Sequence, residues 1–138
     1  TSVAIGADGN PVTSHHDDTN DDLEFYVCGD PACTSGTNRT LEETGSVGYW
    51  TSVAIGVDGN PVTSHLDAIN QDLELYVCRD PTCTSGANQT LENDSTGGYF
   101  SSVAIGVDGN PVISHYDIST GDLELYVGPS TTYTLLFE

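Results

Sequence analysis

The chain has 138 residues and carries 21 acidic side chains against 2 basic ones, a formal net charge of −19 at pH 7. This charge repels nucleic-acid phosphates and anionic lipid headgroups, which argues against both as partners. No apolar run approaches the roughly 20 residues that a membrane-spanning helix needs, so we expect no membrane insertion. The acidic surface favours cations, as bound calcium or as diffuse counterions, or simply keeps the protein soluble.

The sequence is a tandem repeat with three units, residues 1–50, 51–100 and 101–138. The first unit matches the second at most positions, and the third follows the second in register as far as Val127. A unit of this length is one supersecondary element that buries its apolar face against a neighbour. The repeat begins in phase at Thr1, as expected for a mature form or a segment of a longer array.

Each unit is predicted to hold four short strands and no helix, because no stretch keeps a 3.6-residue apolar period. In the second unit, residues 58–61 (Asp-Gly-Asn-Pro) form a strong turn and residues 68–71 form a short polar loop. The expected strands of this unit are 49–57, 62–67, 72–78 and a weaker one at 84–92.

Turns of four residues would place Val57 opposite Val62, Ile55 opposite Ser64 and Leu66 opposite Leu73, which sorts three strands onto two faces. One face is expected to collect Val53, Ile55, Val57, Val62, Leu66, Leu73, Leu75 and Val77. The other is expected to collect Ser52, Ala54, Gly56, Thr63, His65, Glu74, Tyr76 and Cys78.

A repeated four-stranded antiparallel meander is typical of β-propeller blades, and we predict an all-β chain of three such blades. Residues 52–62 read Ser-Val-Ala-Ile-Gly-Val-Asp-Gly-Asn-Pro-Val. This segment resembles the strand–turn–strand core of NHL-type propeller repeats. It is more similar to uncharacterised secreted bacterial repeats that combine such a segment with a Cys-x-Asp-Pro-x-Cys turn. The resemblance implies the fold and little about activity.

Three blades are fewer than the four to eight of a closed propeller, so we expect oligomerisation or polymerisation to complete the fold. Two copies would close a ring of six blades. Head-to-tail contacts that do not close would instead give a filament, and we favour the filament. The C-terminal stretch is either a divergent fourth strand or a strand donated to a neighbouring copy. The residues expected to form this assembly strand are Thr134, Leu135, Leu136 and Phe137.

Four cysteines occur as two equivalent pairs, Cys28 with Cys33 and Cys78 with Cys83. Both positions of the pair are lost together in the third unit, as expected if the partners are bonded. The Asp-Pro turn between them would bring the cysteines together across a hairpin. Zinc is the alternative, but each repeat offers two thiols and no adjacent histidine. Disulfides would imply an oxidising, extracellular location, either secreted or at the cell surface.

One histidine recurs at the same position of each unit, and the expected register places a glutamate opposite it. The pairs are His15 with Glu24, His65 with Glu74, and His115 with Glu124. Such a pair can act as a general base, a metal site or a proton-linked assembly switch. Because it occurs three times, we interpret it as a structural cross-strand pair.

Two further kinds of site are candidates. A calcium ion would find oxygen ligands in the first acidic loop, at Asp17, Asp18, Asn20 and Asp22, although the spacing is not that of an EF-hand. The sequons at Asn38, Asn88 and Asn93 predict N-glycosylation, with O-linked sugar on the Thr/Ser tracts as the alternative.

The aromatic pairs Tyr49–Trp50 and Tyr99–Phe100 open the first strands of two units. They would either pack between units, which we favour, or stack on sugar rings.

The sequence contains no phosphate-binding loop and no Ser-His dyad, so we expect a non-enzymatic protein. We predict a secreted structural repeat protein that binds itself and assembles into an extracellular filament or surface polymer. The alternative is a lectin-like propeller that binds glycans as a closed oligomer, with an enzyme as a third, less favoured option.

Overall fold

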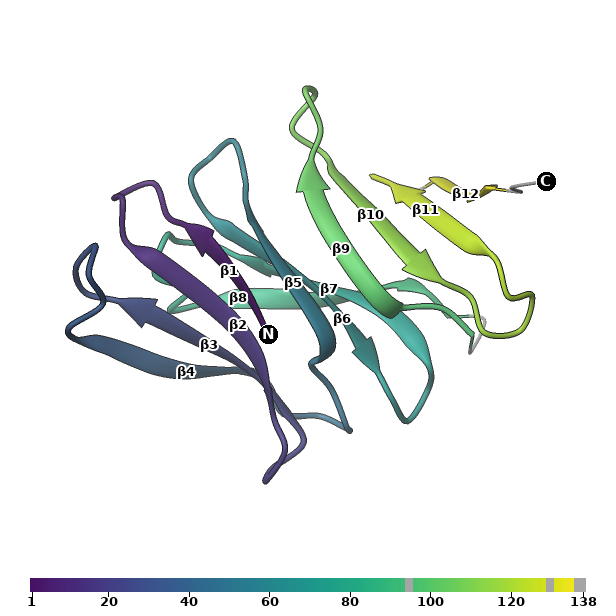
Figure 1. Ribbon diagram of the computed structural model, residues 1–138, viewed down its shortest axis with the longest axis horizontal. Helices are drawn as coiled ribbons and strands as arrows, with labels where there is room; N and C mark the ends of the chain where they lie inside the picture. The colour runs from purple at the N-terminus through teal and green to yellow at the C-terminus, as the bar shows by residue number, and fades with distance from the viewer. Residues whose placement is uncertain (94–95, 129–130, 136–138) are drawn as a thin grey trace.

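A computed structural model describes residues 1–93, 96–128 and 131–135 of the chain, and these residues form strands, turns and loops without a helix. Accordingly, no described helix is long and apolar enough to cross a membrane. Three four-stranded antiparallel sheets lie side by side (Figure 1), and we call them the first, second and third blades. The predicted all-β architecture is therefore confirmed.

Within each blade the strands follow one another as a meander in chain order. The first blade contains β1 (Ser2–Ile5), β2 (Pro11–Asp17), β3 (Asp22–Cys28) and β4 (Gly36–Glu42). The second contains β5 (Tyr49–Ile55), β6 (Pro61–Asp67), β7 (Asp72–Cys78) and β8 (Gly86–Glu92). The third contains β9 (Tyr99–Ile105), β10 (Pro111–Tyr116), β11 (Leu123–Val127) and β12 (Thr131–Leu135).

The register between the second and third strands of each blade is as predicted. Leu66 lies opposite Leu73, and His65 lies opposite Glu74. A four-residue loop, 68–71, joins these strands, as the sequence indicated.

The predicted register of the first strand is wrong. Ile55 lies opposite Pro61 instead of Ser64, and Val53 lies opposite Thr63, because the turn spans five residues, 56–60. The backbone N–H of Gly56 bonds to the carbonyl of Asn60 at 2.8 Å and so closes this longer turn. Pro61 begins the next strand, a position where its missing N–H does no harm.

The longer turn moves the first strand by an odd number of positions, which exchanges the faces of its side chains. Each blade therefore has a histidine face, which carries His65, Thr63, Val53 and Tyr76 in the second blade. Its other side is the serine face, which carries Ser64, Ser52, Leu66, Leu73 and Leu75 in the same blade.

The serine face of one blade packs on the histidine face of the next. The seam between the first and second blades buries Val12, Leu23, Phe25, Val27, Val47, Val53, Tyr76, Cys78 and Cys83. The seam between the second and third blades buries Val62, Leu73, Leu75, Val103, Ile113 and Tyr126. The first strands β1, β5 and β9 are neighbours along these seams (Figure 1).

The C-terminal strand belongs to its own blade. In β12, Thr134 lies opposite Glu124 and Leu135 lies opposite Leu123. Of the two alternatives, a divergent fourth strand or a strand donated to a neighbouring copy, Thr134 and Leu135 follow the first, because both pair with β11. Leu136 and Phe137 lie outside the described residues.

Candidate functional site

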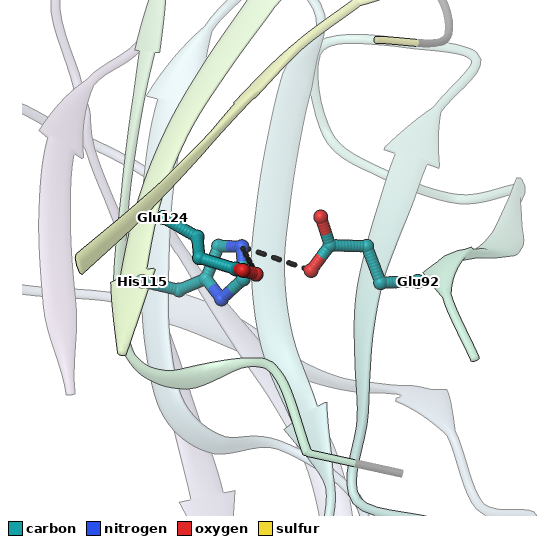
Figure 2. Close-up of side chains that lie close together, drawn as sticks. All are labelled: Glu92, His115 and Glu124. Carbon is teal, nitrogen blue, oxygen red and sulfur yellow. Dashed lines mark ion pairs between the residues drawn. The ribbon is translucent and has the colours of Figure 1, made fainter. Parts of the chain in front are cut away.

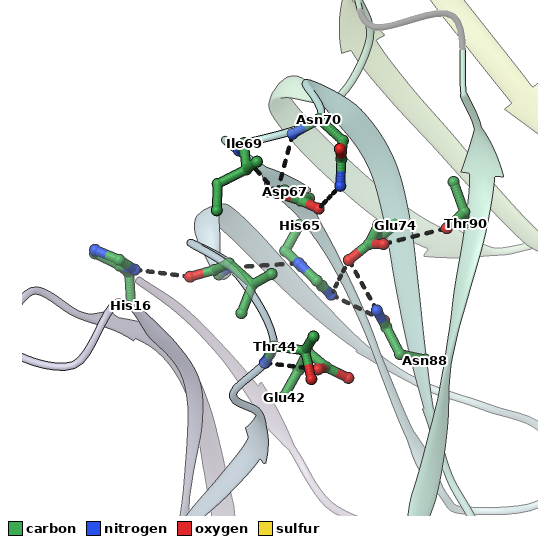
Figure 3. A network of polar contacts seen from close by, with 12 residues as sticks. His16, Glu42, Thr44, His65, Asp67, Ile69, Asn70, Glu74, Asn88 and Thr90 are labelled. Carbon is green, nitrogen blue, oxygen red and sulfur yellow. Dashed lines mark hydrogen bonds and ion pairs between the residues drawn. The ribbon is translucent and has the colours of Figure 1, made fainter.

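His65 is fully buried in the first seam. Its Nδ1 accepts a hydrogen bond from the backbone N–H of Gly48 over 3.3 Å, so the neutral ring carries its proton on Nε2. That N–H donates to Oδ1 of Asn88 at 3.1 Å, and the Asn88 amide donates to Glu74 at 2.8 Å (Figure 3). The Thr90 hydroxyl donates to the other Glu74 oxygen at 3.2 Å. The predicted pair, His65 Nε2 and Glu74 Oε2, lies 3.8 Å apart within this network.

Burial disfavours the charged forms of both His65 and Glu74. Burial lowers the pKa of His65, and the hydrogen bond to Asn88 counteracts this only in part. Burial also raises the pKa of Glu74, while the bonds from Asn88 and Thr90 oppose the rise. The contact is therefore better described as a buried hydrogen-bond network than as an ion pair.

The third blade builds the same network with a different acceptor. Nδ1 of His115 accepts the backbone N–H of Gly98 over 3.2 Å. The register places Thr132 where the second blade has Asn88. Nε2 of His115 instead lies 2.9 Å from Glu92, which reaches over from the second blade, and 3.9 Å from its own Glu124 (Figure 2). Sequence reasoning missed Glu92, because it considered only pairs within one unit.

Glu92, His115 and Glu124 also have the separation expected of metal ligands, since their ligand atoms lie within 4.8 Å of one another. The hydrogen bond from Gly98 argues against a metal, because it places the ring proton on Nε2, the nitrogen that faces both carboxylates. A protonated nitrogen has no electron pair to offer an ion. The cluster thus fits a buried N–H held by carboxylates.

His15 of the first blade is less covered than His65 and His115, and its side chain is 29% exposed. Its Nδ1 lies 3.4 Å from the carbonyl oxygen of His16, and Nε2 lies 3.5 Å from Glu24. Asn38 donates to the same Glu24 carboxylate at 2.5 Å. The three His–Glu pairs are therefore alike in register and differ in what covers them.

The acidic loop of the first blade is organised as a turn. Asp17 accepts hydrogen bonds from the Thr19 backbone at 2.8 Å and from the Asn20 amide at 2.7 Å. The Asp18 side chain is fully exposed, and Asp22 lies opposite Asp17 at the end of the strand pair. Within the described ranges these residues do not meet as a ligand cluster. Calcium binding there stays a prediction that this geometry does not favour.

The three sequons differ in surroundings. The Asn88 side chain is used at both ends, by His65 and Glu74, and the Asn38 amide nitrogen is bonded to Glu24. A glycan would attach through that nitrogen, so these bonds disfavour modification at both positions. Asn93 is exposed and borders residues 94–95, which lie outside the described part.

Both predicted cysteine pairs form disulfides, Cys28–Cys33 and Cys78–Cys83, with Cα atoms 4.8 and 4.9 Å apart. The zinc alternative is therefore set aside. Asp80 organises the second turn by accepting bonds from the Thr84 hydroxyl at 2.6 Å and the Thr84 backbone at 2.9 Å. These bonds hold the pKa of Asp80 well below its usual range.

An exposed aromatic patch lies where the first strands of the second and third blades begin. It consists of His16, Tyr49, Trp50, Tyr99 and Phe100. The Trp50 ring lies 4.9 Å from Tyr99 and 5.0 Å from Phe100. Trp50 is 39% and Phe100 is 65% exposed. The patch therefore bridges the two blades, as expected for packing, and still presents ring faces to solvent, as a sugar platform requires.

The backbone holds these two rings outward. Trp50 and Phe100 adopt positive φ angles of 47° and 54°. Each lies in a β-bulge, where the register of the first strand shifts between Tyr49 and Ser52 and at the equivalent point of the third blade. A left-handed conformation is unfavourable for a bulky residue, and strain of this kind concentrates at functional sites.

Polar groups border the patch on the side of the first blade. The Tyr49 hydroxyl donates to Asp21 at 3.1 Å, and His16 stacks on Tyr49 with ring centroids 3.9 Å apart. Nε2 of His16 lies 3.7 Å from the same Asp21 oxygen. A carboxylate is thus placed beside the aromatic rings.

Two cavities lie at the opposite end of the strands, near the turns that follow β1, β5 and β9. The first, about 410 Å³, is open and polar and includes Asp8 and Arg39. The second, about 230 Å³, is mainly aliphatic, with Val62, Leu75 and Ile105 in its wall. Neither combines exposed aromatic faces with hydrogen-bonding groups, so we favour the aromatic patch as the functional site.

The fold and this site define a repeat protein of propeller-type blades with a solvent-facing aromatic patch. No protein-family model and no curated protein sequence matches the chain, so no family match supports the resemblance to NHL-type repeats. Among solved structures, the chain is similar to a fucose lectin from Kordia zhangzhouensis in complex with methyl-fucoside. The TM-score is 0.63 at 9% sequence identity, over 99% of this chain and 97% of that chain. At this identity the similarity shows a shared fold.

Proposed function

We propose that this protein is an extracellular carbohydrate-binding protein and that the aromatic patch is its sugar-binding surface. The observation that carries the proposal is the outward-held pair Trp50 and Phe100, on a fold shared with a fucose lectin. This proposal replaces the filament favoured by the sequence, because a structural filament has no need of strained, exposed rings. Both disulfides support an extracellular location.

The chemistry of the patch suits a sugar. One side of a hexose ring presents C–H groups that pack on an aromatic face, while its hydroxyls need hydrogen-bond partners. Trp50 and Phe100 supply the faces, and Asp21 with the Tyr49 hydroxyl supplies polar partners at the rim. Because the backbone presets the ring positions, little conformational entropy is lost on binding.

The net charge of −19 limits the class of sugar that the protein is expected to bind. Sialylated, sulfated and uronic-acid glycans carry negative charge and are repelled by this surface. We therefore expect neutral sugars, and the methyl group of a 6-deoxyhexose such as fucose matches an apolar ring surface.

The test is titration of the purified protein with methyl-fucoside and other neutral methyl glycosides by calorimetry, together with a glycan array. We expect Trp50→Ala and Phe100→Ala to weaken binding by at least about tenfold each, the loss that about 1.4 kcal/mol of contact represents. Trp50→Phe keeps a ring and is expected to retain much of the affinity. Val107→Ala, which shortens an exposed side chain on a distant turn, is the matched control.

Two outcomes would contradict the proposal. One is an array without any neutral glycan bound by folded protein. The other is sugar binding that survives Trp50→Ala but is lost on Arg39→Gln, which would move the site to the polar cavity.

A further inference from the structure

The histidine face of the first blade exposes residues that the other blades bury. Val3 is 64% exposed, whereas its counterparts Val53 and Val103 are 7% and 8% exposed. Ile5 is 60% exposed on the same face. The same valine and isoleucine occupy these positions in all three blades, and only in the first blade is no serine face packed on them. The exposed surface therefore matches one that is buried elsewhere in the chain.

The serine face of the third blade shows the reverse situation. Leu123 is 37% exposed, whereas its counterparts Leu23 and Leu73 are fully buried. The described strand residues on this face are all uncharged, in a chain of net charge −19. They include Ser102, Ala104, Val112, Ser114, Tyr116, Leu123, Leu125 and Val127. An apolar, charge-free face of this kind is typical of a protein–protein contact.

The polar contacts of the two seams repeat with a period of fifty residues. The Thr51 hydroxyl donates to Ser14 at 2.9 Å, and fifty residues later the hydroxyls of Ser101 and Ser64 are hydrogen-bonded at the same distance.

A second bond repeats with the same period. The Val53 backbone N–H donates to Ser2 at 3.2 Å. Fifty residues later, the Val103 backbone N–H donates to Ser52 at 3.1 Å.

The next members of both series fall on the two free faces. The serines are Ser114 and Ser102 on the third blade, and their partners would be the Thr1 hydroxyl and the Val3 backbone N–H on the first blade. One chain thus holds both halves of a third seam at its opposite ends.

We propose that a second copy of this chain covers these faces, so that the third blade of each copy packs on the first blade of the other and two copies close a ring of six blades. The contact repeats the seam that the chain already makes twice within itself. Two such seams leave no blade face uncovered and give a blade count within the four to eight of closed propellers. The inference rests on the seams and is independent of carbohydrate binding.

The first test is the mass of the purified protein in solution, by light scattering and sedimentation. We expect twice the 14.5 kDa of one chain. The dimer should strengthen with salt, because salt screens the repulsion between two acidic chains. A dilute, folded monomer would overturn the proposal, and long polymers would overturn ring closure.

Variants test the direction of the contact. Val3→Asp damages the first blade's free face and Leu123→Asp damages the third blade's, and each alone should give monomers. Mixing the two should restore a weaker dimer, because one intact seam can form between a good third blade and a good first blade. Val107→Asp places the same charge on an exposed turn and should remain dimeric. A mixture that stays monomeric would contradict the head-to-tail arrangement.

A chemical cross-link covers the case in which an aspartate variant does not fold. The double variant Thr1→Cys with Ser114→Cys should form a disulfide between copies and run as a dimer without reductant. The precedent is the 2.9 Å between the hydroxyl oxygens of Thr51 and Ser14. Absence of the cross-linked dimer under oxidising conditions would overturn the proposed register.

Discussion

Thr51 donates its hydroxyl proton to Ser14 across the first seam, over 2.9 Å and in a fully buried setting. Ser64 and Ser101 are hydrogen-bonded at the equivalent positions of the second seam, where Ser64 donates because the Ser101 hydroxyl proton goes to the Trp50 carbonyl. Blade packing in this chain is therefore specified by polar register as well as by apolar side chains.

Ser64→Ala should lower the free energy of unfolding by about 1 kcal/mol, the usual contribution of one buried hydrogen bond. A larger loss is not expected, because Ser101 keeps its bond to the Trp50 carbonyl at 3.0 Å. Urea unfolding measures the change as a lower midpoint at constant slope. An unchanged midpoint would show that the bond does not stabilise the seam.

The stability of the protein should fall as the pH falls below about 6.5. Burial lowers the pKa of His65, so in this range the unfolded chain takes up a proton that the folded chain refuses. The raised pKa of Glu74 acts in the opposite sense, because the folded state takes up its proton first, and this offsets part of the loss at the acid end.

Thermal unfolding at pH 7.5 and pH 6 checks this prediction in wild type and His65→Gln. The variant should lose less stability on acidification than the wild type. Ser64→Ala is the control, since it removes a seam contact without a titrating group and should lower stability equally at both pH values. An equal acid response of wild type and His65→Gln would contradict the assignment to His65.

Because of the strained bulge, we expect glycine and alanine at position 100 to differ in their effect on stability but not in their effect on sugar binding. At the positive φ of Phe100, glycine should be more stable than alanine by about 1 kcal/mol, because it has no Cβ to clash in the left-handed region. Both Phe100→Gly and Phe100→Ala remove the ring and should weaken sugar binding alike. Chemical unfolding and sugar titration of the two variants measure each effect. Equal stabilities would show that the bulge stores no strain.

The two disulfides should be reduced at different rates only when the protein is monomeric. Cys83 is buried in the first seam, whereas Cys33 is exposed on the free face of the first blade. In the monomeric Val3→Asp variant, Cys28–Cys33 should therefore be reduced faster than Cys78–Cys83. In the closed ring the two disulfides should be reduced at similar rates. Alkylation of the freed thiols followed by mass spectrometry measures both rates, and a difference that persists in the dimer would contradict the prediction.

These results show how far the repeat sequence determines the fold. The blade architecture and the pairing of His65 with Glu74 follow from strand patterns and a four-residue loop. The first strand was misplaced because Asp-Gly-Asn-Pro marks a turn without fixing its length, and Pro61 proved to start a strand.

The contacts between blades were harder to predict. Glu92 reaches His115 from another unit, and the aromatic patch depends on bulges that place Trp50 and Phe100 outward. Periodicity within one unit carries no information about either. The missed signal was the glycine of each connector, Gly48 and Gly98, whose positive φ angles direct a backbone N–H to the next histidine.

The most direct test of carbohydrate binding uses Trp50, which is the single tryptophan of the chain, so that intrinsic fluorescence reports on the proposed site alone. Titration with methyl-fucoside or another neutral methyl glycoside should give a saturable change in its emission, and Phe100→Ala should shift that titration to higher sugar concentration. An emission spectrum that stays the same while calorimetry records sugar binding would place the sugar elsewhere and contradict the account.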